Sequence, residues 1–267
     1  MPSLVGWDDV GYNTQGEDWL DFATPNIDAL VTESVVLEHH YSSWICGPTR
    51  ASFLTGRYAA RMGFHTTPGM FEANLPLDET TVAQELQAYG YRTALIGKWH
   101  MGYEQWALYP TYRGFDTYYG YLSGSIEYFS KFTEGGWFDV HDNDAIVTDS
   151  AEMSNDYHLT QLLQDKAEAT ISAHARDFPN EPLFLYYAMQ NVHAGAGAGM
   201  EAPTEYIEMC GFAVDGVNDN GDYSEHQGYC ALMIMLDEAV GNTVCALETS
   251  GIADNMLLVL ASVRLYA

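Results

Sequence analysis

Residues 181–193, EPLFLYYAMQNVH, contain an almost unbroken apolar run that begins after Pro182. A strand with apolar side chains on both of its faces must be covered on both sides, as the strands of parallel sheets are. The segment NMLLVLAS at 255–262 has the same character and predicts a second buried strand. A third, shorter strand that ends in a loop is predicted within YRTALIGKWH at 91–100. These runs indicate a core built on a mostly parallel sheet.

Helical patterns separate the predicted strands. They are TVAQELQAYG at 81–90, the amphipathic segment at 158–175 and the long apolar segment at 229–251. Strands that alternate with helices predict an α/β sandwich around a mostly parallel sheet. With 267 residues and neither an internal repeat nor a low-complexity linker, we expect one domain over 1–267. In such sheets, binding sites lie at the carboxyl ends of the strands.

The chain is strongly acidic, with 37 Asp and Glu against 10 Lys and Arg and a formal charge of −27. This charge repels phosphates, so general electrostatic binding of nucleic acid is excluded, and binding to acidic lipid surfaces is disfavoured for the same reason. No apolar run approaches the ~20 residues of a membrane span, and no signal peptide is visible. Six of the ten bases lie within 50–113, which predicts a local anion site unless they pair with surface acids: Arg50, Arg57, Arg61, Arg92, Lys98 and Arg113.

The chain has four cysteines, Cys46, Cys210, Cys230 and Cys245, and their spacings fit no zinc pattern. Cys210 and Cys230 are able to form a disulfide in a secreted protein, but nothing in their spacing demands it. Buried free thiols are therefore the favoured interpretation.

One cysteine lies at a predicted helix start, in the segment WICGPTRASFLTGRY at 44–58. Pro48 is predicted as the first helical residue, because its fixed φ suits that position and its missing N–H is not needed there. Gly56 is predicted to end the helix. The positive end of a helix favours anions, so Cys46 beside Arg50 indicates an anion site that holds a reactive group.

Three further polar residues follow the predicted strands. Lys98 and His100 come just after the strand predicted at 91–96, and His193 ends the segment 181–193. A lone histidine in a loop is more often an ordinary hydrogen-bonded residue than a functional one. Because the carboxyl ends of parallel strands share one edge of the sheet, we expect all three to converge there with Cys46 and Arg50.

Two long segments resemble signatures of one family. CGPTRASFLTGRY at 46–58 resembles the first signature of the type I sulfatases, and GYRTALIGKWHMGY at 90–103 resembles the second. Four more segments resemble the arylsulfatase B branch, so that the resemblance covers essentially the whole chain: 24–30, 110–129, 182–193 and 236–255. It implies an alkaline-phosphatase-like α/β/α sandwich with a mostly parallel sheet, here as an N-terminal catalytic domain without the C-terminal subdomain.

The resemblance also implies a mechanism. A formylglycine-generating enzyme would convert Cys46 to formylglycine, and one hydroxyl of the aldehyde hydrate would attack the sulfur of a sulfate ester. Arg50 would hold the hydrate, and Lys98 would bind sulfate oxygens. His100 would orient or deprotonate the hydrate, and His193 would protonate or polarise the leaving oxygen. The implied substrates are small-molecule or carbohydrate sulfate esters. Family members usually work in the secretory pathway, in lysosomes or outside the cell.

The family also uses a divalent cation, usually calcium in this branch, held by acidic residues and by formylglycine, here Cys46. Its first carboxylates form an Asp-Asp pair, and two alignments of MPSLVGWDDVGY are possible. The favoured one matches Gly6-Trp7, places the ligand positions on Ser3 and Leu4, and makes Asp8 and Asp9 ordinary loop acids. The other makes Asp8 and Asp9 the ligands. The second pair of ligand positions falls on Val263 and Arg264, neither of which binds calcium.

These departures predict a chain truncated at both ends. Two functions follow: an arylsulfatase-like sulfuric ester hydrolase, or an inactive sulfatase-like fragment that at most binds anions. A related phosphatase or phosphonate hydrolase is a third interpretation, and the second signature counts against it.

Overall fold

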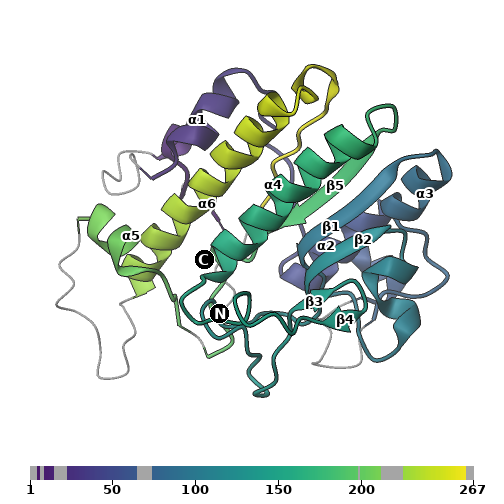
Figure 1. Cartoon of the computed structure of the whole chain (residues 1–267), viewed down its shortest axis with the longest axis horizontal. Coiled ribbons are helices and arrows are strands. Elements are labelled where there is room, and N and C mark those ends of the chain that lie inside the picture. Colours follow the sequence, from purple (N-terminus) through teal and green to yellow (C-terminus); the bar gives the residue numbers. More distant parts are fainter. Residues whose placement is uncertain are drawn as a thin grey trace.

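The computed structural model describes residues 5–6, 9–14, 23–64, 74–197, 199–211 and 225–262. Its centre is a five-stranded sheet in the order β4-β3-β2-β1-β5 (Figure 1). Three strands run parallel, and they are β1 (Arg92–Lys98), β2 (Thr117–Tyr121) and β5 (Leu183–Ala188). The two-residue strands β3 (His141–Asp142) and β4 (Ala145–Ile146) add an antiparallel hairpin at one edge. The predicted mostly parallel sheet is confirmed.

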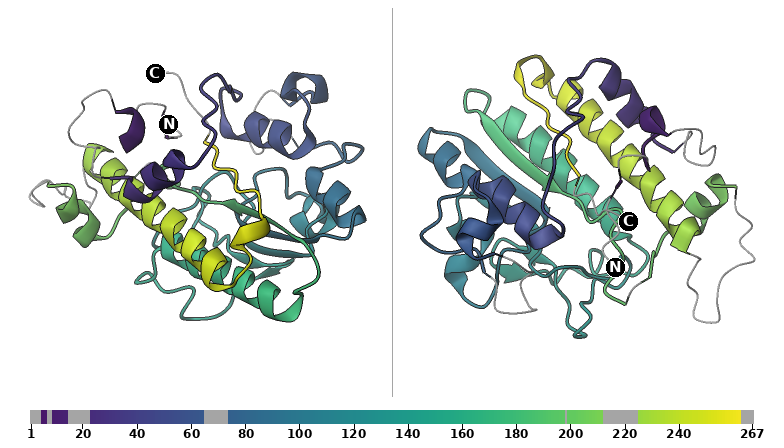
Figure 2. Two further views of the ribbon diagram at one scale, coloured as in Figure 1. Left: turned by 90° about the horizontal axis from the view of Figure 1, so that it is seen from above. Right: turned by 180° about the vertical axis from the view of Figure 1, so that it is seen from behind.

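Helices cover both faces of this sheet, as the predicted α/β/α sandwich requires. On one side α4 (Leu159–Asp177) packs on the sheet, and α6 (Glu225–Thr249) packs on α4 with α1 (Pro25–Thr32) and α5 (Thr204–Met209) beside it (Figure 2). On the other side lie α2 (Cys46–Thr55) and α3 (Val82–Ala88). Five 3₁₀ turns connect these elements at Gly11–Asn13, Ala59–Met62, Trp106–Leu108, Pro110–Tyr112 and Ala253–Asn255.

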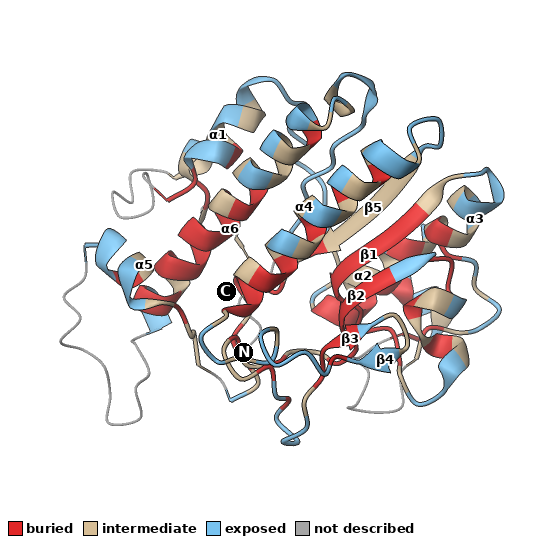
Figure 3. Cartoon of the chain, in the orientation of Figure 1, coloured by how far each residue is buried: buried red, intermediate tan, exposed pale blue. Residues whose placement is uncertain are grey.

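The core has two parts, one on each face of the sheet. Successive side chains of β1 point to opposite faces, so Ile96 joins the cluster beneath α4 and α6 while Leu95 joins the cluster beneath α2 and α3. Both residues are at most 3% exposed. Figure 3 shows the same buried centre between exposed outer helix faces. The central strand is therefore apolar on both sides, as the parallel-sheet pattern predicts.

Two strand predictions need correction. β5 is mostly half-buried rather than fully buried, because it is an edge strand and pairs only with β1. The segment 256–262 is extended but lies in no strand, and its apolar side chains are exposed, Leu257 to 88%. No described strand pairs with it, so its apolar character does not lead to burial. The Ser262 hydroxyl donates to the Val5 carbonyl at 3.1 Å, near the start of the chain.

The long helix α6 is apolar because it is a core helix. By length and composition it is the one described helix able to cross a membrane, and 61% of its most apolar stretch is buried inside the fold. Asp237 is buried within it and its carboxylate accepts from the backbone N–H groups of Asn26 and Ile27, at 3.0 and 2.8 Å. This contact satisfies the first turn of α1 from a residue distant in sequence.

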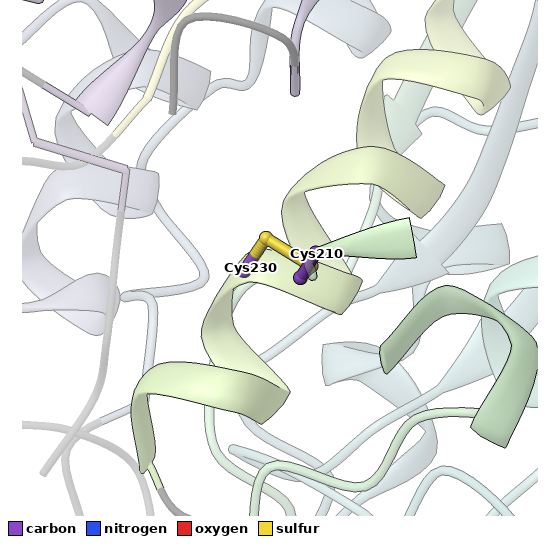
Figure 4. The surroundings of a disulfide bond; sticks show 2 residues. All are labelled: Cys210 and Cys230. Carbon is purple, nitrogen blue, oxygen red and sulfur yellow. A yellow bond between two sulfur atoms is a disulfide. The ribbon is translucent and has the colours of Figure 1, made fainter. Parts of the chain in front are cut away.

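The interpretation of Cys210 and Cys230 as free thiols was wrong. They form a disulfide that ties the end of α5 to the first turns of α6 (Figure 4). The two residues are 20 apart in sequence, so the bond closes a loop whose entropy would otherwise favour unfolding, by about 3 kcal/mol. Spacing alone did not reveal this pairing, because the proximity of the two residues depends on how α5 packs against α6.

Candidate active site

The first element of the site is the start of α2. The helix begins at Cys46, two residues before the predicted start, so Pro48 is its third residue. Its N-cap residue, Ile45, has no side chain able to accept from the first backbone N–H groups. Gly56 ends the helix in the left-handed conformation, as predicted, with φ of 67°. Cys46 therefore lies directly at the positive end of the helix.

The second element is the end of β1. Lys98 is its last residue, and His100 follows two residues later with φ of 58°, a strained value for a residue other than glycine. This backbone places Nδ1 of His100 3.3 Å from Sγ of Cys46. Both side chains are buried, at 3% and 4% exposure. The predicted approach of the second segment to Cys46 is thus present in the structure.

Arg50 joins the two elements. Its Nη1 donates to the Lys98 carbonyl at 2.8 Å and to the Tyr186 hydroxyl at 3.3 Å. Its Nε is buried without a hydrogen-bond partner among the described residues. The guanidinium therefore keeps one donor available at the site, and the sheet holds its orientation.

Lys98 is buried beneath the cysteine, at 2% exposure. Burial lowers the pKa of its ammonium group to about 8, partly offset by the nearby Cys46 thiol, while the positive charge of Arg50 lowers it further. At neutral pH the lysine therefore remains mostly charged. None of the ion pairs among the described residues involves Lys98, and a buried cation without a paired carboxylate suits an anionic ligand.

His193 follows β5, and its Nδ1 hydrogen-bonds to the carbonyl of Ala194 at 2.7 Å. Burial lowers the pKa of its imidazole to about 3, and the positive charges of Lys98 and Arg50 lower it as well. These charges act on the ring because the three side chains gather at one edge of the sheet. The structure therefore brings together all five predicted residues, Cys46, Arg50, Lys98, His100 and His193.

Sequence reasoning missed two tyrosines at this site. Tyr186 of β5 contacts Arg50, as described above. Tyr121 ends β2 and pairs in register with Lys98, and its buried hydroxyl has no hydrogen-bond partner among the described residues. Burial raises its pKa, and the charge of Arg50 opposes that effect. A tyrosine at a strand end is a weak sequence signal, since tyrosine is also an ordinary strand residue.

The other bases of the predicted cluster have structural partners. Arg57 pairs with Glu79 at 2.8 Å, and Arg92 lies near Glu181 and over the ring of Phe178. Arg113 donates to backbone carbonyls, including that of Glu79 at 2.7 Å. Arg61 is exposed. Of the six clustered bases, Arg50 and Lys98 are the two that the described structure places beside Cys46, so clustering in sequence overstated the extent of the predicted anion site.

The described residues do not fit a divalent cation. Nowhere in the described ranges do three or more His, Cys, Asp or Glu side chains gather as a metal would need. The carboxylate of Asp9 accepts instead from the Gly6 N–H and the Tyr229 hydroxyl, both at 2.5 Å. Asp8, Ser3, Leu4, Val263 and Arg264 lie outside the described residues.

A helix start, a buried lysine and two histidines gather at the carboxyl edge of a parallel sheet, and their charges suit an anion. Comparison with known proteins agrees: the sequence profile described as Sulfatase matches residues 4–262. The chain belongs to the sulfatase family, and its sheet is that of the alkaline-phosphatase-like fold.

Individual relatives are similar over nearly the whole chain. Arylsulfatase J of Mus musculus is 33% identical over 96% of this chain and 41% of its own length. N-acetylgalactosamine-6-sulfatase of Mus musculus is 27% identical over 97% of this chain and 48% of its own. The crystal structure of Ps i-CgsB has a TM-score of 0.76 and 26% identity, and covers 94% of this chain and 54% of its own. The chain thus spans about half the length of these relatives.

Proposed function

We propose that this chain hydrolyses sulfate esters through a formylglycine derived from Cys46. The observation that carries the proposal is the 3.3 Å approach of His100 Nδ1 to Cys46 Sγ at the start of α2. Formylglycine would supply an aldehyde hydrate, one hydroxyl of which attacks the sulfur of the ester. The hydrate would form at the position of the Cys46 thiol.

Arg50 and Lys98 would hold the sulfate group. Lys98 lies buried beside Cys46 as a charged donor, and the unpaired Nε of Arg50 adds a second one. Both charges are already in position, so little reorganisation is needed as negative charge develops in the transition state. Tyr121 supplies a neutral donor at the same edge.

The two histidines would move the protons. His100 accepts the proton of the attacking hydroxyl through the nitrogen that faces Cys46. His193 is neutral in the free chain, because its pKa is lowered to about 3 by burial and by Lys98 and Arg50. A bound sulfate offsets those positive charges and raises that pKa. His193 then acquires the proton that it gives to the leaving oxygen.

The relatives support a carbohydrate sulfate as substrate. One solved relative, 25% identical with a TM-score of 0.74, is described in complex with k-i-k-neocarrahexaose, and a curated relative is named for N-acetylgalactosamine-6-sulfate chemistry. A sugar carrying a sulfate ester is therefore the substrate class that we propose for this chain.

The lack of a metal-binding cluster among the described residues supports a second function, the binding of sulfate without catalysis. A chain whose described acidic residues bring no metal site together would bind sulfate at Arg50 and Lys98 without turning an ester over. The two functions share the anion site and differ in turnover.

The test is turnover of a chromogenic aryl sulfate by the purified chain after co-expression with a formylglycine-generating enzyme. Hydrolysis that is lost in Cys46→Ala is the expected result. The matched control is Cys245→Ala, since Cys245 is the other free cysteine and is exposed. Mass spectrometry of the peptide containing position 46 reports the conversion.

Calorimetry with inorganic sulfate separates the two functions. Sulfate binding that depends on Lys98, without turnover of a fully converted chain, identifies the anion-binding function. A converted chain that neither binds sulfate nor hydrolyses the ester contradicts both.

A further inference from the structure

A second concave site lies beside the first. It is a pocket of about 190 Å³ at the carboxyl ends of β1 and β2, next to β3. This volume is below the roughly 300 Å³ at which ligand pockets usually begin, so it suits one small ring. Aromatic and polar side chains share its lining, chiefly Tyr103, Tyr109, Trp137, Ser123, Asp139 and His141.

His141 has an unused nitrogen in this pocket. The residue is 7% exposed, and its Nε2 lies 3.1 Å from the Asp139 carboxylate. A carboxylate only accepts, so Nε2 carries the proton and Nδ1 of the neutral ring is left as an acceptor. That Nδ1 is buried with no hydrogen-bond partner in the described part of the chain. A buried acceptor without a donor is costly, and a ligand hydroxyl would supply one.

The pocket shares a wall with the sulfate site. The Asp139 carboxylate accepts from the N–H groups of Leu122 and Ser123, at 3.3 and 2.9 Å. The Leu122 carbonyl in turn accepts from the His100 N–H at 3.1 Å. Gly124 lies so close to His100 that a methyl group at position 124 would come within 2.9 Å of Nε2. The short segment 122–124 therefore contacts His100 on one side and the pocket-lining Asp139 on the other, so the pocket adjoins the site at Cys46.

The aromatic and polar side chains that line the pocket favour a neutral sugar ring over an aryl group or an acidic ligand. The indole of Trp137 is 53% exposed, which leaves aromatic surface for the C–H face of a ring. Burial raises the pKa of both Tyr103 and Tyr109, and the Asp139 charge adds to this, so both phenols stay protonated as donors. The Asp139 carboxylate repels sulfate and carboxylate groups. An apolar face with hydroxyl-binding groups at its edge matches a neutral sugar ring better than an aryl group, which presents no hydroxyls.

We propose that this pocket binds one uncharged, hydroxylated sugar ring of a saccharide whose sulfate lies at Cys46. The ring stacks on Trp137, and one of its hydroxyls donates to Nδ1 of His141. The position of the sulfate rests on the proposed function, whereas binding of the neutral ring does not.

Binding is measured by saturation-transfer NMR and by calorimetry with methyl β-D-galactopyranoside and methyl β-D-glucopyranoside. We expect millimolar dissociation constants for at least one of these glycosides, as a single ring with few contacts allows. Trp137→Ala is expected to weaken binding about tenfold because the stacking surface is lost. His141→Phe, which keeps the ring but removes the acceptor, is expected to weaken it about fivefold to tenfold. Tyr112→Ala is the matched control, since Tyr112 is 54% exposed and lies outside the lining.

The outcomes separate this inference from the proposed function. No glycoside binding by the folded wild-type chain overturns it, as does equal binding by the wild type and both pocket variants. Binding of phenol but of neither glycoside, with the same sensitivity to Trp137, identifies an aryl pocket instead. None of these measurements needs turnover, so a chain without sulfatase activity can satisfy them and an active chain can fail them.

Discussion

Each functional side chain has its properties because of its neighbours. Lys98 is an ordinary lysine in the sequence, but burial lowers its pKa to about 8 and places it against Cys46. His193 is likewise shifted by burial and by two cations that come from other elements. Residue type and spacing predicted which side chains would come together at this edge of the sheet. The electrostatic environment of each could not be predicted, because it depends on contacts between α2, β1 and β5.

The Tyr121 hydroxyl is predicted to contribute to sulfate binding or transfer. Tyr121→Phe removes a buried donor that has no hydrogen-bond partner among the described residues and lies beside Arg50 and Lys98. We expect kcat/KM for an aryl sulfate to fall about tenfold to hundredfold, which is less than the roughly hundredfold to thousandfold that follows the loss of one oxyanion-hole donor. If the chain binds sulfate without hydrolysing the ester, we expect Tyr121→Phe to lower its affinity for sulfate.

The control for this substitution is Tyr119→Phe. Tyr119 belongs to the same strand, but its hydroxyl donates to Glu152 at 2.7 Å. Equal losses of kcat/KM in both variants would indicate a general effect on β2. If Tyr121→Phe has the kcat/KM of the wild type, the Tyr121 hydroxyl does not contribute to sulfate binding or transfer.

Among the elements, helices were predicted best because their signals are local. The strong amphipathic pattern at 158–175 corresponds to α4 at Leu159–Asp177. Thr81 and Gln84 form a capping box at the start of α3, within the predicted 81–90. The start of α2 was misplaced by two residues, because Pro48 is tolerated anywhere in the first turn. Strand burial was less predictable, since it depends on which neighbours a strand acquires.

Asp237 of α6 is predicted to hold α1 in place. Asp237→Ala leaves the N–H groups of Asn26 and Ile27 without their acceptor, so we expect a loss of about 1.5–3 kcal/mol in the free energy of unfolding. Urea denaturation followed by circular dichroism measures the change. Glu248→Ala, at an exposed position of the same helix, should change stability by less than about 0.5 kcal/mol. A similar result for both variants would mean that the contact does not stabilise the fold.

At the scale of the whole molecule, stability should depend on Glu201. Burial raises the pKa of its carboxyl from 4.5 to about 7, and a hydrogen bond to Glu127 contributes. The native state therefore keeps a proton that the unfolded chain releases between about pH 4.5 and 7. The free energy of unfolding contributed by Glu201 consequently falls as pH rises through that window.

Glu201→Gln is the test of this pH dependence. His158 has the opposite sign, because burial lowers its pKa to about 4 and stability is gained as pH rises towards its unfolded value. The measured quantity is therefore the difference between the wild type and the variant, from urea denaturation at pH 4.5 and at pH 7. We expect the variant to lose less stability over this range, whereas the exposed control Glu205→Gln should follow the wild type. Parallel curves for the wild type and Glu201→Gln would contradict the prediction.

The exposed apolar segment 256–260 is predicted to make the chain self-associate. Leu257 is 88% exposed and Val259 is 62% exposed, beside a sheet whose edge strand β5 has one described neighbour. Exposed apolar strand-like segments are sites of association between chains. Light scattering after gel filtration should show association that grows with concentration. The double substitution Leu257→Lys with Val259→Lys should reduce it, and Tyr89→Lys, at an 80% exposed position elsewhere, should not.

The signatures around Cys46 and Lys98, the alternation of strands and helices and the acidic composition were enough to predict the fold class, the family and the five residues of the candidate site. These features can be recognised from short stretches of the sequence, because each depends on residue types and spacings that are local in the chain. Tertiary structure alone decided the disulfide, the exposure of 256–262, the unpartnered hydroxyl of Tyr121 and the pocket beside His141. Each of these depends on contacts between residues distant in sequence, for which a single chain carries no local signal.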